Sequence, residues 1–80
     1  STGSWFVNFS SYRQRSTAER GVAKLQPGQG RVIVATGDSN GRTIYRVRVV
    51  DLPDKASADA IARSLEKEYG LAKLWVGKSG

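Results

Sequence analysis

The sequence predicts a single α+β domain of βαββαβ order, in which a four-stranded antiparallel sheet carries two helices on one face. Four short runs are rich in β-branched and aromatic residues, which is typical of strands. Two longer stretches repeat apolar residues at helical spacing, and turn-forming residues lie between the elements. Because 80 residues bury only one modest core, we expect one domain.

The first predicted strand begins at Trp5 and continues to the adjacent serines at positions 10 and 11. Alternation along the strand points Trp5, Val7 and Phe9 toward the core. The positions expected to point outward are Phe6, Asn8 and Ser10.

The first predicted helix begins at Ser16, because Ser16 followed three residues later by Glu19 has the spacing of a capping box. Ala18 and Leu25 share its apolar face. The helix is expected to end before Gln26-Pro27-Gly28, since proline and glycine interrupt helices.

Residues 31–35 and 44–50 are predicted to form a hairpin around a turn at residues 37–41. The second strand of this hairpin alternates strictly. Its aromatic and β-branched side chains face the helices, and Arg46 and Arg48 face the other way. A sheet that hides one face and presents cations on the other is suited to a polar or anionic ligand.

The second predicted helix follows Pro53, with Asp54 or Ser57 as its N-cap, and repeats apolar residues at helical spacing up to Gly70. Gly70 is a typical residue to end a helix. Residues 74–76 are predicted to form a short last strand.

Right-handed crossovers place the first and third strands at the centre of this ferredoxin-like sheet and both helices on one face. The opposite face is left open, and strand parity adds Ile44, Lys73 and Trp75 to the outward positions already named. Large aromatic side chains on such a surface are unusual unless a ligand covers them. The expected spans are residues 1–4 for a linker, 5–76 for the domain and 77–80 for a tail.

These open-face side chains suggest a binding platform. Aromatic rings stack on planar bases or on the C–H face of a sugar, arginines pair with carboxylate or phosphate, and Asn8 bonds hydroxyl or amide groups. Two structural interpretations stand beside this one. Trp75 could simply cover the sheet edge, and Arg46 with Arg48 could be solvated charges that limit aggregation.

Composition restricts the classes of function. A formal charge of +6 favours anionic partners. The absence of cysteine and histidine excludes thiol and imidazole catalysis and the usual zinc ligands. No two of the seven carboxylates share the open face, so we expect no enzymatic activity, no metal and no cofactor. No apolar run approaches a membrane span or a signal-peptide core, so membrane contact is expected only through a parent protein.

The first strand reads Trp5-x-Val7-Asn8-x-Ser10-Ser11-Tyr12 and the third reads Tyr45-Arg46-Val47-x-Val49. Followed by a proline, a second helix, a glycine and a terminal strand, these segments resemble the SPOR domain, a bacterial envelope module that binds septal peptidoglycan. The resemblance covers nearly the whole chain, up to about residue 76. Ser10 stands where the family pattern has glycine, and Asn8 where it has glutamine.

The resemblance implies non-catalytic binding of peptidoglycan, with a preference for denuded glycan strands, which lack stem peptides. It also implies that the domain, expected to be monomeric, directs a parent protein to the division septum in the bacterial periplasm or cell envelope. That parent protein could carry an enzymatic domain. Carried over by position, or added by strand parity, the expected glycan-binding residues are Phe6, Asn8, Ser11, Ile44, Arg46, Arg48 and Trp75.

The alternative is a single-stranded nucleic-acid-binding module of RNA-recognition-motif-like architecture, which has the same element order and aromatics on its open face. Its third-strand signature is absent here, because residues 41–47 place their one aromatic on the buried side. Nucleic acid is therefore not the expected partner. A third hypothesis is a protein-interaction module that uses the edge strand at residues 31–35, which carries no distinctive motif.

Overall fold

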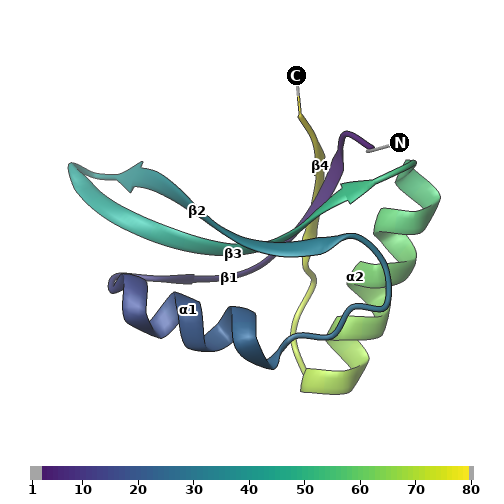
Figure 1. Cartoon of the computed structure of the whole chain (residues 1–80), viewed down its shortest axis with the longest axis horizontal. Helices are drawn as coiled ribbons and strands as arrows, with labels where there is room; N and C mark the ends of the chain where they lie inside the picture. The colour runs from purple at the N-terminus through teal and green to yellow at the C-terminus, as the bar shows by residue number, and fades with distance from the viewer. Residues whose placement is uncertain (1–2, 80) are drawn as a thin grey trace.

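The computed structural model describes residues 3–79 and has the predicted order of strands and helices. All neighbouring strands are antiparallel, and their order in the sheet is β2-β3-β1-β4, so the predicted α+β fold with β1 and β3 at the centre is confirmed. Both helices lie on one side of the sheet (Figure 1). The elements are β1 (Trp5–Tyr12), α1 (Arg15–Lys24), β2 (Arg31–Ser39), β3 (Arg42–Leu52), α2 (Lys55–Tyr69) and β4 (Trp75–Lys78).

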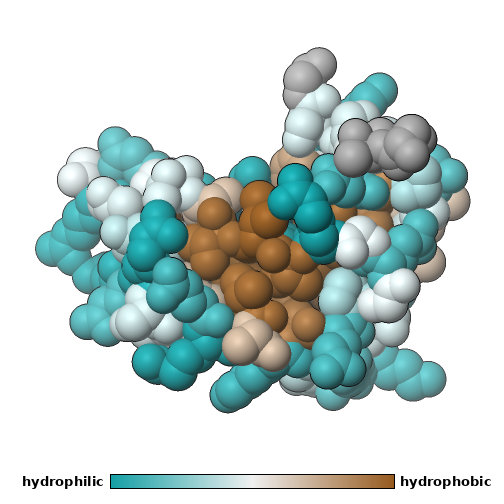
Figure 2. All heavy atoms as spheres, viewed as in Figure 1, coloured by the Kyte–Doolittle hydropathy of each residue, from teal (hydrophilic) through white to brown (hydrophobic). Residues whose placement is uncertain are grey.

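The core lies between the sheet and the two helices. Its largest fully buried side chains are Val7 of β1 and Val47, Val49 and Leu52 of β3. Figure 2 shows apolar side chains gathered at the centre of the view, near β2 and between the helices, with polar side chains around them. The sheet face opposite the helices is left without a covering layer (Figure 1), as the sequence predicts.

The hairpin turn is shorter than expected. Asn40 and Gly41 have φ angles of 54° and 78°, which fits the two-residue turn that Asn-Gly favours between twisted strands. The turn predicted over residues 37–41 is therefore wrong in extent, because residues 37–39 continue β2 and pair with β3.

A β-bulge in β1 changes the direction of one predicted open-face residue. Asn8 pairs with Arg48, but the next pair is Ser10 with Val47, so two residues of β1 lie opposite one of β3. Because Val47 is buried against the helices, Ser10 shares the helix-covered side, and its predicted outward orientation is wrong. Its Oγ is buried and has no hydrogen-bond partner among the described residues.

The two helices begin differently. The structure starts α1 at Arg15 after Gln14, whose side chain makes no capping bond, so the capping box predicted from Ser16 is wrong. For α2, Asp54 accepts a hydrogen bond of 2.7 Å from the Ser57 N–H, which also lowers the pKa of the Asp54 carboxyl.

The C-terminal part of the chain contains the end of α2 and the last strand, β4. Gly70 ends α2 in the left-handed conformation, with φ of 63°, as predicted. The last strand runs to Lys78, so residues 77 and 78, expected in a tail, pair with the start of β1. Residues 1, 2 and 80, assigned to the linker and the tail, lie outside the described residues.

Candidate functional site

The seven predicted site residues all lie on the sheet face that no helix covers, which we call the open face. Cross-strand partners point to the same side of a sheet, and Asn8 pairs with both Arg48 and Trp75, while Ser11 pairs with Arg46. The bulge that turns Ser10 inward is what brings Ser11 to the open face. The site residues are Phe6, Asn8 and Ser11 on β1, Ile44, Arg46 and Arg48 on β3, and Trp75 on β4.

Arg48 is held in the middle of this face by two neighbours. Its Nε donates a 2.6 Å hydrogen bond to Oδ1 of Asn8, and its guanidinium carbon lies 4.4 Å from the centroid of the Phe6 ring. The Phe6 ring lies against Gly77 of β4, where an added Cβ atom would be 2.5 Å from the ring. Phe6 therefore supports Arg48 more than it offers a free ring for stacking.

Burial and like charge both act on Arg48. Partial burial, and secondly the positive charge of Arg46, lower the pKa of the Arg48 guanidinium from its ordinary value. An arginine stays charged at neutral pH even so. An anionic ligand would relieve the repulsion between the two arginines, so this part of the face favours a negative group.

Trp75 is the most exposed large apolar side chain among the described residues, with 69% of its surface accessible. It lies beside Asn8, and the Lys73 Nζ is 5.5 Å from its ring centroid. Pairing between β1 and β4 stops at Trp75, and the unpaired edge of β1 beyond it borders a hollow of about 220 Å³. Residues lining the hollow are Asn8, Phe9, Ser10, Ser11, Lys73, Leu74 and Trp75.

Glu66 on α2 fixes the backbone that leads into Trp75. Its Oε2 accepts a 2.6 Å hydrogen bond from the Leu74 N–H, and Arg63 donates to both of its oxygens at 2.8 and 2.7 Å. Arg63 also donates to the Leu74 carbonyl at 3.1 Å. The bonds from Arg63, and secondly from Leu74, lower the pKa of the Glu66 carboxyl.

Arg46 is held less firmly than Arg48. No hydrogen bond or ion pair joins it to another residue of the range 3–79, and its guanidinium passes over the backbone of Gly37 on β2, where a side chain would collide with it. Next to it, Ile44 borders a hollow of about 440 Å³ that includes Arg13 and Arg42 and no carboxylate. This end of the open face therefore offers free cationic groups.

Sequence reasoning missed three contributors to the site. Gly77, against which Phe6 lies, falls in the expected tail at residues 77–80. Gly37, over which Arg46 passes, falls in the turn expected at residues 37–41. The third is Glu66, whose spacing of three residues from Arg63 was the available signal.

Other kinds of site find no support in residues 3–79. No group of three His, Cys, Asp or Glu side chains is placed to hold a metal ion. Across the same residues, neither helix combines the length and apolar character needed to cross a membrane.

Comparison with known proteins gives one family and one solved structure. The model of the SPOR domain family matches residues 1–73. The crystal structure of the RlpA SPOR domain from Pseudomonas aeruginosa is similar in fold, with a TM-score of 0.68 and 11% sequence identity. The match covers 95% of this chain and 99% of that chain. A search of curated proteins finds no match.

Proposed function

The chain belongs to the SPOR domain family, and from this premise we propose that its open face binds peptidoglycan glycan strands, with a preference for denuded strands. Family membership supports a module that binds peptidoglycan at the division septum. The domain itself would be a non-catalytic targeting module in the cell envelope, and any enzymatic activity would belong to its parent protein.

One observation carries this proposal: a row of side chains, Arg48, Asn8 and Trp75, crosses three neighbouring strands of the open face. The row offers a cation, an amide and an exposed aromatic ring in sequence. Trp75 would stack on the C–H face of a sugar. Oδ1 of Asn8 already accepts from Arg48, and its Nδ2 would donate to an acetamido or hydroxyl oxygen. A sugar ligand of this kind does not require side chains that hydrogen-bond to the edges of nucleic-acid bases.

The arginines would distinguish denuded strands from intact ones. Removal of a stem peptide frees the lactyl carboxylate of each muramic acid residue, which creates an anion along the glycan. Arg48, already repelled by Arg46, and Arg46, free of any ion pair in residues 3–79, would pair with such carboxylates. In an intact strand the same lactyl group forms an amide with the stem peptide and carries no charge at that position.

Exclusion would add to this preference. The open face is a sheet surface on which the exposed Trp75 stands beside Asn8, so a glycan must lie close to the backbone to reach both. Stem peptides projecting from the glycan would collide with the sheet and prevent that approach.

Pull-down with purified sacculi tests the proposal. The fraction of domain retained should rise several-fold after an amidase has removed stem peptides from the wall, and Trp75→Ala, checked for folding by circular dichroism, should abolish the gain. Equal retention before and after amidase treatment, or no retention at all, contradicts the preference for denuded strands.

A salt titration separates glycan from nucleic acid as the ligand. Binding to single-stranded nucleic acid weakens steeply with salt, because each neutralised phosphate releases counterions. Retention on the amidase-treated wall should weaken less between about 50 and 200 mM salt than the roughly 10³-fold expected for many phosphate contacts. Tighter binding to single-stranded RNA than to treated wall would overturn the assignment.

A further inference from the structure

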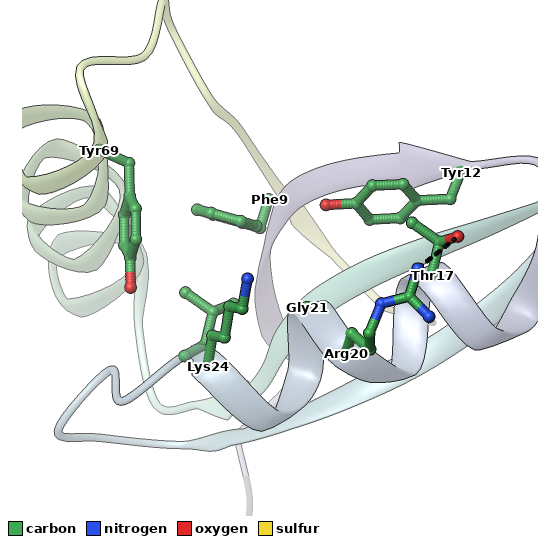
Figure 3. Close-up of a pocket in the computed structure, with 8 residues that line it drawn as sticks. Phe9, Tyr12, Thr17, Arg20, Gly21, Lys24 and Tyr69 are labelled. Carbon is green, nitrogen blue, oxygen red and sulfur yellow. Dashed lines mark hydrogen bonds between the residues drawn. The ribbon is translucent and has the colours of Figure 1, made fainter.

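Another cleft lies on the other side of the sheet, between the two helices, and has a volume of about 310 Å³. Figure 3 shows its side chains converging from three elements, with Phe9 and Tyr12 on β1, Tyr69 on α2, and Arg20 and Lys24 on α1. We call it the interhelical groove. Its lining residues are Phe9, Tyr12, Thr17, Arg20, Gly21, Lys24, Leu25 and Tyr69.

Aromatic rings form the apolar part of the groove, and two of them contact each other. Phe9 and Tyr69 meet edge to face, with centroids 5.3 Å apart and ring planes at 75°. Tyr12 lies against the helix at Gly21, where a Cβ would be 3.6 Å from the tyrosine hydroxyl. Tyr69 keeps 40% of its surface accessible, although its ring belongs to a preformed wall. An unfilled site lined by these rings suits one apolar side chain of a ligand.

The rim of the groove is cationic. Arg20 and Lys24 are four residues apart, so they stand one turn apart on the same side of α1. Arg20 makes only a long hydrogen bond of 3.4 Å to Thr17, and neither cation is in an ion pair within residues 3–79. No carboxylate lines the groove. The charge therefore has no partner within this cleft.

We propose that the interhelical groove binds an acidic peptide segment of a partner protein, with one apolar side chain between the rings and flanking carboxylates against Arg20 and Lys24. The volume of the groove equals that of roughly ten water molecules, which fits a single large side chain. Charge complementarity supports an acidic segment around that side chain, because the cations stand at the border of the groove. The groove and the open face lie on opposite sides of the sheet, so a peptide and a glycan would bind without competing. This proposal does not depend on what the open face binds.

An NMR titration of the ¹⁵N-labelled domain tests the proposal. The probe is a capped peptide with one phenylalanine between two pairs of aspartates, and the controls replace either the phenylalanine by alanine or the aspartates by lysines. Amide shifts should concentrate at Phe9, Gly21, Lys24 and Tyr69, and each control peptide should bind at least about tenfold more weakly. Absence of shifts at millimolar peptide, or shifts centred on Arg46 and Arg48, overturns the proposal.

A matched pair of variants tests the cationic rim. Lys24 and Lys67 each lie in the last turn of their helix, so Lys→Glu has a similar effect on the helix dipole at both sites. Lys24→Glu should weaken peptide binding about fivefold, whereas Lys67→Glu, outside the groove, should change it less than twofold. Equal losses would show general attraction to a basic protein and contradict a built site.

A third variant tests the aromatic wall. Tyr69→Ala should weaken the peptide about tenfold while leaving retention on amidase-treated wall unchanged. Two other results would also overturn the peptide proposal. Concentration-dependent shifts at Tyr69 without peptide would identify a second copy of the chain as the occupant, and shifts there on adding denuded glycan would identify a sugar.

Discussion

The two halves of the open face differ in how firmly their arginine side chains are held. In the β4 half, made of Phe6, Asn8, Arg48 and Trp75, a hydrogen bond and a cation–π contact fix the arginine. In the hairpin half, made of Ser11, Ile44 and Arg46, the arginine makes no hydrogen bond or ion pair within residues 3–79. The same residue type therefore stands two positions apart on one strand in two different physical states.

This difference indicates a division of tasks. Fixed groups lose little conformational entropy on binding, so they favour a ligand of one shape. An arginine without a hydrogen-bonded partner also attracts anions, but the attraction is screened by salt and the side chain must be ordered on contact. We expect the β4 half to determine which glycan binds and the hairpin half to increase affinity through charge.

The largest loss is expected from Trp75→Ala in the β4 half. Removal of the stacking surface should weaken binding to denuded glycan about 30-fold, or ~2 kcal/mol, measured by isothermal titration calorimetry. Because the ring is mostly exposed, the free energy of unfolding should change by less than about 0.5 kcal/mol. A variant that fails to fold would place Trp75 among the structural residues of the sheet edge.

Arg48 should depend on the geometry of its guanidinium as well as on its charge. We expect Arg48→Ala to cost about tenfold in affinity and Arg48→Lys to recover less than half of that loss in free energy, because an ammonium lacks the planar fork. Full recovery of calorimetric affinity by lysine would show that the contacts with Asn8 and Phe6 have no role in binding.

Arg46 provides the matched comparison on the same strand. Arg46→Ala should weaken binding about fivefold at low salt, or ~1 kcal/mol, and less at higher salt. Arg46→Lys should restore most of the affinity, since only the charge is needed there. If lysine restored less of the affinity at position 46 than at position 48, the roles assigned to the two halves would be reversed.

Ser10→Ala should act on stability and not on binding. The hydroxyl is buried without a partner on the helix side of the bulge, so its removal should raise the free energy of unfolding by about 0.5 kcal/mol in urea denaturation. Glycan affinity should stay unchanged. Weaker glycan binding with unchanged stability would place Ser10 on the open face and contradict the bulge.

Glu66 should give the smallest effect, a pH dependence confined to the acid range. Its pKa is lowered in the folded state by Arg63 and Leu74, so its stabilisation is present above the unfolded pKa and is lost as pH falls through the folded pKa. Glu66→Gln should lower Tm at neutral pH and flatten the decline of Tm on acidification. Glu68→Gln on the same helix is the control, and an equal change there would show a general charge effect.

The sequence predicted the strands, the helices and their order because the relevant signals are local. The alternation from Tyr45 to Val49 assigned Arg46 and Arg48 to the open face. Gly70 marked the end of α2 correctly, and Asp54, one of the two expected N-caps, is the residue that caps it. These patterns reflect covalent geometry and burial, which neighbouring residues carry.

Interactions between distant residues explain the errors. The bulge at Ser10 is defined by pairing with Val47, and strict alternation in β1 gives no sign of it. The strand at Gly77 exists because it pairs with Phe6, which lies far away along the chain. The hydrogen bond between Arg48 and Asn8 depends on the register of β1 with β3. Residue types indicated which groups could bind, and strand register determined which of them meet.

Mapping the bound surface directly tests whether the open face is the glycan site. Amide shifts of the labelled domain would be followed during titration with a denuded glycan oligomer and, separately, with the same oligomer carrying its stem peptides. We expect the largest shifts at Asn8, Arg48 and Trp75, smaller ones at Ser11 and Arg46, and little change with the peptide-bearing oligomer. Shifts confined to the helices, or equal shifts with both oligomers, would contradict denuded-glycan binding by the open face.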